Sequence, residues 1–140
     1  MGFILFVIAL VLTGFVFAIN IVIQPIYYIV TFKWKSGVKQ LDKWFYKLAL
    51  SIDQFGNVAT ATTLQLLLTK PLSHSFGEED DTVSYVLACN RELGTLTALG
   101  RFIGWVLDKI DKDHLTKAIN NKIAKDEEAI LRYQQNKYFK

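Results

Sequence analysis

Cysteine, histidine and proline are scarce in this chain of 140 residues, which has one cysteine, two histidines and two prolines. Because Cys89 has no second cysteine to pair with, the sequence excludes a secreted scaffold held by internal disulfides and fits a reducing compartment. Structural zinc usually takes four ligands in short paired spacings. His74, Cys89 and His114 are 15 and 25 residues apart. We therefore expect no metal site, no cofactor and no catalytic residues built on them.

Charge is absent from the first part of the chain, since residues 3–32 contain no Asp, Glu, Lys or Arg. About 20 apolar residues in a helix cross the ~30 Å core of a bilayer. A cleaved signal peptide would show a basic residue before a shorter apolar run and a small-residue cleavage site after it, and neither is present. The sequence predicts a retained single-pass anchor with its interfacial segment over residues 1–32.

The uncharged run is longer than one bilayer crossing requires, because 30 helical residues extend about 45 Å. Pro25 removes a backbone donor and predicts a kink or a break. Two placements are open. The span covers residues 3–24 with residues 25–36 along the interface, or it is a tilted span over residues 8–30.

Positive charge follows the run at once. Five lysines lie within residues 33–47, and no basic residue precedes the run. Basic residues near a span are retained on the cytoplasmic side. This asymmetry predicts an N-terminus outside and a C-terminal domain in the cytoplasm.

Residues 33–55 are predicted to form a basic amphipathic juxtamembrane helix. Apolar residues recur at helical spacing from Val38 to Ile52, and lysines recur every four residues on another face. Two interpretations carry equal weight: the helix lies on an anionic membrane surface, or its apolar stripe packs on the following domain. The residues predicted to contact the membrane surface are Tyr27, Tyr28, Lys33, Trp34, Lys35, Lys39, Lys43, Trp44 and Lys47.

A small helical domain is predicted over residues 56–134, followed by a frayed tail over residues 135–140. Gly56 and Asn57 predict a turn, and residues 70–81 predict a long polar loop. The predicted helices cover residues 58–69, 82–90, 95–111 and 114–133. The fold class is therefore all-α, with one N-terminal transmembrane helix followed by a small helical domain.

Within this domain, the spacing of apolar residues predicts the core. It comprises Leu96, Leu99, Phe102, Ile103 and Val106, packed on Leu64, Leu67, Val86 and Ile119. Asp80 or Asp81 is expected to cap the next helix rather than bind a cation. Gly100 and Gly104 indicate close packing against a neighbouring helix rather than a second membrane crossing. His114 is expected at the surface.

Two segments, Ile52-Asp53-Gln54-Phe55-Gly56-Asn57 and Phe76-Gly77 followed by Thr82-Val83-Ser84-Tyr85-Val86-Leu87, resemble small phage-encoded membrane-anchored proteins of unassigned activity. The similarity covers about residues 51–119. Ala88-Cys89-Asn90 stands where Gly-Lys-Asn is expected, and Glu79 where Pro is expected. The resemblance implies a viral origin and supplies no active residues.

Together these features favour a phage-encoded, non-catalytic interaction module at the host inner membrane. Its expected partners are a bilayer with anionic headgroups and an unidentified protein, with a homo-oligomer possible and no nucleic acid. The alternatives are a lysis effector, either holin or spanin-like, and a structural membrane protein of a virion. We expect that the protein is not an enzyme, because no convergent pair of titratable groups stands out from surface charge.

Overall fold

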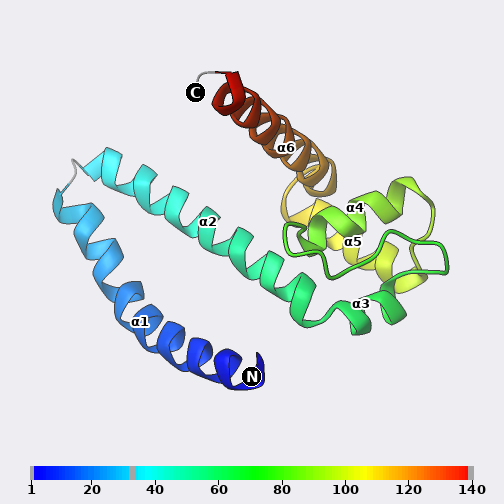
Figure 1. Cartoon of the computed structure of the whole chain (residues 1–140), viewed down its shortest axis with the longest axis horizontal. Coiled ribbons are helices and arrows are strands. Elements are labelled where there is room, and N and C mark those ends of the chain that lie inside the picture. Colours follow the sequence, from blue (N-terminus) through cyan, green and yellow to red (C-terminus); the bar gives the residue numbers. More distant parts are fainter. Residues whose placement is uncertain (1, 32–33, 139–140) are drawn as a thin grey trace. The chain divides into compact units, whose positions relative to one another are not determined.

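The computed structural model describes residues 2–31 and 34–138, and every regular element in those ranges is an α-helix. The all-α class predicted from the sequence is confirmed. The chain divides into two compact units, Met1–Ala49 and Leu50–Lys140. The helices are α1 (Gly2–Thr31), α2 (Trp34–Ala59), α3 (Ala61–Leu68), α4 (Val83–Glu92), α5 (Ala98–Ile110) and α6 (His114–Tyr138) (Figure 1).

Helix α1 is unbroken from Gly2 to Thr31 and contains Pro25 in its interior. The break considered at Pro25 is therefore absent, and apolar helices of this kind tolerate proline where neighbouring groups compensate for the lost hydrogen bond. None of the residues of α1 is buried. Among the described residues, α1 is the one helix that is long and apolar enough to cross a membrane.

Helix α2 continues through Gly56 and Asn57 to Ala59, so the turn predicted at these two residues is wrong. The chain turns instead at Thr60, whose amide and hydroxyl both donate to the Gly56 carbonyl at 3.1 and 2.7 Å. Asn57 does not end the helix because its side chain is engaged elsewhere. It bonds to the backbone of the loop before α4.

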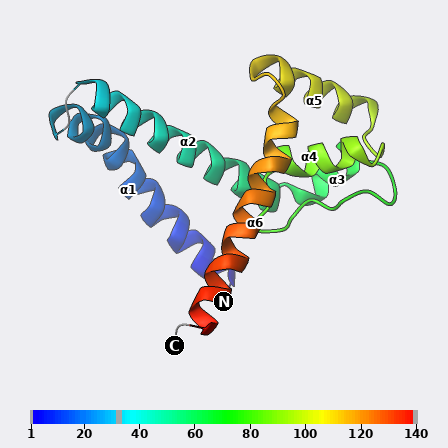
Figure 2. The same cartoon turned by 90° about the horizontal axis from the view of Figure 1, so that it is seen from above.

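The second unit folds around α4. Helix α4 packs on α5 and α6, and α3 packs on α5. The connection between α3 and α4 runs alongside α4 (Figure 2), where the His74 amide donates to the Asn90 side chain at 2.8 Å. The buried apolar residues are Leu68, Phe76, Val86, Leu87, Ala88, Leu96 and Leu115. Leu96 and Val86 are in the core as predicted.

The core prediction is wrong for two residues of α5, since Phe102 is 57% exposed and Leu99 is also exposed. Ile103 packs against the core as predicted, whereas Leu67 on α3 is exposed. The reason on α5 is that the helix turns its glycines inward. A Cβ atom at Gly100 would collide with the Leu68 carbonyl oxygen, and one at Gly104 would lie 3.0 Å from Leu115 Cδ1. The close packing predicted for the two glycines is confirmed, and Phe102 and Trp105 lie exposed on another face of α5.

Candidate functional site

The predicted membrane-surface residues lie at the end of α1 and along α2. Tyr27 and Tyr28 are in the last turns of α1, with ring centroids 5.7 Å apart. Tyr27 is exposed and Tyr28 is half-buried. Lys33 lies outside the described residues, and Trp34 begins α2.

The four remaining lysines form one stripe on α2, because each follows the previous one by four residues. This lysine stripe consists of Lys35, Lys39, Lys43 and Lys47, and all four side chains are exposed. Trp44 is half-buried, with its ring 4.9 Å from that of Phe45. Asp42 is the only acidic residue between positions 34 and 49. The first half of α2 is therefore a cationic surface.

An apolar stripe occupies another side of the same helix. It consists of Val38, Leu41, Phe45, Leu48, Ile52 and Phe55. Ile52 is 60% exposed and Phe55 is 58% exposed, although both belong to the unit that contains the folded core. These exposures do not support the interpretation that the stripe packs on the following domain.

The apolar stripe and the lysine stripe point in nearly opposite directions. At about 100° per residue, Lys39, Lys43 and Lys47 fall roughly 130° to 170° around the helix from the middle of the apolar stripe. One flat surface cannot contact both faces. Helix α2 therefore offers two separate surfaces, one cationic and one apolar.

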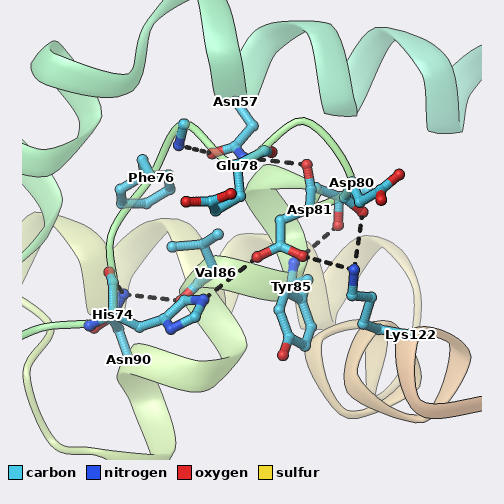
Figure 3. A network of polar contacts seen from close by, with 12 residues as sticks. Asn57, His74, Phe76, Glu78, Asp80, Asp81, Tyr85, Val86, Asn90 and Lys122 are labelled. Atoms are coloured by element: carbon cyan, nitrogen blue, oxygen red, sulfur yellow. Dashed lines mark hydrogen bonds and ion pairs between the residues drawn. The ribbon is translucent and has the colours of Figure 1, made fainter. Parts of the chain in front are cut away.

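The polar groups of the second unit form a network that holds the connection before α4 (Figure 3). Asn57 is fully buried, and its amide donates to the carbonyls of Glu78 and Asp81 at 2.9 and 3.1 Å. Its oxygen accepts from the Gly77 amide at 3.2 Å. Asn57 thus holds the loop against α2 with three hydrogen bonds. The sequence interpretation missed this role, because it assigned Asn57 to a turn.

Asp81 joins the same network from the last position before the α4 cap. Its carboxylate is 3.0 Å from Lys122 Nζ and 3.4 Å from His74 Nε2 (Figure 3). Burial lowers the pKa of Lys122, but the hydrogen bond and the charge of Asp81 more than offset this, so that its pKa is raised. The expectation that Asp80 or Asp81 caps α4 is wrong. The cap is Thr82, whose hydroxyl accepts from the Tyr85 amide at 3.0 Å.

Tyr85 and Cys89 lie one turn apart on α4, beside this network. A hydrogen bond with Cys89, together with burial, raises the pKa of Tyr85 to about 12. Burial also raises the pKa of the Cys89 thiol. Because the thiolate is the nucleophilic form of cysteine, this environment makes Cys89 less reactive. The pair fits a structural role.

Ser84, His114 and Asp111 form a chain of hydrogen bonds that the sequence interpretation missed. His114 Nε2 is 3.1 Å from Ser84 Oγ, and His114 Nδ1 is 3.2 Å from an Asp111 oxygen. Hydrogen bonds from Lys117 and His114 lower the pKa of Asp111. His114 was expected simply at the surface, but it links α6 to the start of α4.

This order of residues matches a serine–histidine–aspartate triad, but the direction of the hydrogen bonds differs. The Ser84 hydroxyl donates to Asp53 at 2.9 Å, so His114 does not accept its proton. Asp53 also accepts from the Val83 amide at 3.2 Å. Ser84 is buried, whereas an activated nucleophile must reach substrate and give its proton to the histidine. The chain of bonds therefore ties α2, α4 and α6 together at the start of α4.

No group of three His, Cys, Asp or Glu side chains in the described part of the chain is arranged to hold a metal ion. Within the acidic run, Asp81 is paired as above, while Glu78, Glu79 and Asp80 are exposed. A scan against protein-family models and searches of curated proteins and solved structures found no match to this chain. The assignment of function therefore depends on the surfaces just described.

Proposed function

We propose that this chain is a phage-encoded, membrane-anchored interaction protein that acts by contact at the host inner membrane. The observation that carries the proposal is the pairing of α1, which is uncharged and has no buried residue, with the lysine stripe directly after it. Such a helix exposes apolar side chains over its whole length, and only lipid or another apolar surface satisfies them. The resemblance over residues 51–119 supports the viral origin.

In this proposal α1 spans the membrane with its N-terminus outside, and the rest of the chain lies in the cytoplasm. The lysine stripe then faces anionic headgroups, where each lysine near the surface contributes about 1 kcal/mol. Trp44 and the tyrosines at the end of α1 are of the kind that gathers at the level of the headgroups. The apolar stripe of α2 is left for a protein partner.

The polar side chains of the second unit bond to one another, and this favours action by contact over catalysis. Ser84 is hydrogen-bonded to both Asp53 and His114, and Asp81 forms an ion pair with Lys122. No buried side-chain polar atom in the described residues is left without a hydrogen-bond partner. Polar groups in a fully satisfied network stabilise the fold and hold their side chains in fixed orientations.

The topology is tested with reporters fused after Lys140 in bacterial cells. We expect a fluorescent reporter that matures in the cytoplasm to be active, and alkaline phosphatase, which needs the periplasm, to be inactive. A matched variant replaces the lysine stripe with glutamine and adds two lysines before Phe3, and it should invert both results. Alkaline phosphatase activity of the unmodified chain would contradict the proposal and favour the spanin-like alternative.

A further inference from the structure

The apolar stripe of α2 has the spacing of a coiled coil. Its members, residues 38, 41, 45, 48, 52 and 55, are separated alternately by three and four residues. The pattern extends to Trp34 at one end of the helix and Ala59 at the other. A repeat of 3.5 residues keeps one narrow seam facing a partner helix along its length.

The residue types at the two seam positions favour a parallel pair. With Val38, Phe45 and Ile52 at the a positions, the d positions are Leu41, Leu48 and Phe55. β-branched residues at a and leucine at d are typical of parallel two-stranded coiled coils. Val38 and Ile52 meet the first condition, and Leu41 and Leu48 meet the second.

The charges on α2 permit a second copy to approach the seam. Between residues 37 and 58, the e and g positions that flank the seam contain one charged residue, Asp42. The last three lysines of the lysine stripe lie away from the seam, so two copies would not bring them together, whereas Lys35 occupies the e position beside Trp34. Phe45, Ile52 and Phe55 are about half exposed or more, which leaves them open to a partner.

We infer that the apolar stripe of α2 is covered by the α2 of a second copy, in a parallel dimer. The inference rests on the proposed function, because α1 anchored in one membrane places α2 of every copy on the same side of the bilayer. It also starts α2 of every copy at the same height. Confinement to one membrane raises the effective concentration of the second helix, which allows a seam of this length to pair.

The inference is tested by oxidative crosslinking of the full chain in native membranes. All variants carry Cys89→Ser, so that one introduced cysteine is the only thiol. Leu41→Cys and Leu48→Cys place this thiol in the seam, where a parallel pair brings the two copies within disulfide reach. Lys43→Cys is the matched control on the lysine stripe. We expect a species of twice the chain mass from both seam variants and little or none from the control.

A second pair of variants separates the seam from the helix as a whole. In the Leu41→Cys background, Leu48→Glu adds a charge to the seam, whereas Leu50→Glu adds the same charge on an exposed position outside it. We expect Leu48→Glu to abolish the crosslinked dimer and Leu50→Glu to leave it. Equal loss in both variants would contradict the inference.

Membrane association is measured on the same samples by resistance to alkaline carbonate extraction. A membrane-bound chain without seam crosslinks would overturn the dimer and leave the proposed function standing, as would seam crosslinks only to a protein of another mass. Complete release by carbonate would contradict the proposed function itself. The two failures are therefore distinguishable.

Discussion

The units Met1–Ala49 and Leu50–Lys140 are both helical, but they treat apolar side chains in opposite ways. In the first unit, α1 has no buried residue, although almost every side chain in its first half is apolar. In the second unit, Val86, Leu87 and Ala88 are completely buried on α4. A run of apolar residues thus shows that a surface must be covered. It does not show whether lipid, a second chain or the same chain covers it.

The same contrast occurs inside the second unit, between α4 and α5. Helix α4 supplies the centre of the core, whereas α5 exposes Phe102 and Trp105, whose rings stack with centroids 6.1 Å apart. Both helices alternate apolar and polar residues at helical spacing. Glycine decides the difference, because α5 packs closely through Gly100 and Gly104. Only Ile103 and Leu107, on the same face, pack against the core beside them.

The largest effect is expected at Leu87, at the centre of this contrast. Leu87→Ala removes a fully buried side chain, so it should lower the free energy of unfolding of the second unit by roughly 2 to 5 kcal/mol. Hydrogen exchange of the α4 amides in the full chain measures the free energy of unfolding of the second unit without a contribution from α1.

The control for Leu87 is Leu93→Ala, because Leu93 is exposed directly after α4. It should change the exchange rates little. Equal acceleration by both variants would mean that α4 is not the centre of the core.

The next largest effect is expected at Asn57, which tests whether the end of α2 belongs to the folded unit. Asn57→Ala leaves the Gly77 amide and the buried Asp81 carbonyl without this partner, which should cost roughly 1 to 3 kcal/mol. The Glu78 carbonyl still accepts from the Asp81 amide. Release of the loop should be seen as faster hydrogen exchange of the amides of residues 77–81 in the variant.

Gln54→Ala is the matched control for Asn57. Gln54 also donates to the loop, at 3.2 Å from the Asp80 carbonyl, but this hydrogen bond is exposed to solvent. Its loss should cost well under 1 kcal/mol, because water replaces it. Equal effects at the two positions would contradict the buried role of Asn57.

The sequence was sufficient for the class of the fold and for most helices, because local signals determine them. Gly94 has a φ of +68° directly after α4, at the stop predicted for residues 90–94. Contacts between residues far apart in the sequence leave no pattern in the local sequence from which they could be predicted. Gly56 and Asn57 have the composition of a turn, and only the loop some 20 residues later makes a helix the better solution.

The same limit explains the side chains that the sequence interpretation missed. Asp53, Ser84 and His114 are about 30 residues apart in succession, so no short motif joins them. For α1 and the first half of α2, the sequence pattern alone indicated the apolar and cationic surfaces. Helix α1 has no buried position that could reveal which surface covers it.

The smallest effect is expected at Phe102, and it separates α5 from α4 most sharply. Phe102→Ala removes a side chain that is 57% exposed, so no cavity forms in the core. The stacked contact with Trp105 is worth roughly 0.5 to 1.5 kcal/mol in such pairs, and solvent exposure places this pair at the lower end. We therefore expect the free energy of unfolding, measured by hydrogen exchange of the full chain, to fall by about 0.5 kcal/mol. This is far below the 3 to 5 kcal/mol typical of a buried phenylalanine.

Phe102→Tyr is the control, because tyrosine keeps an aromatic ring that can stack on Trp105, and it should leave the free energy of unfolding unchanged. A loss of several kcal/mol for Phe102→Ala would mean that α5 buries its aromatic face in solution, and that the division between the two helices does not hold.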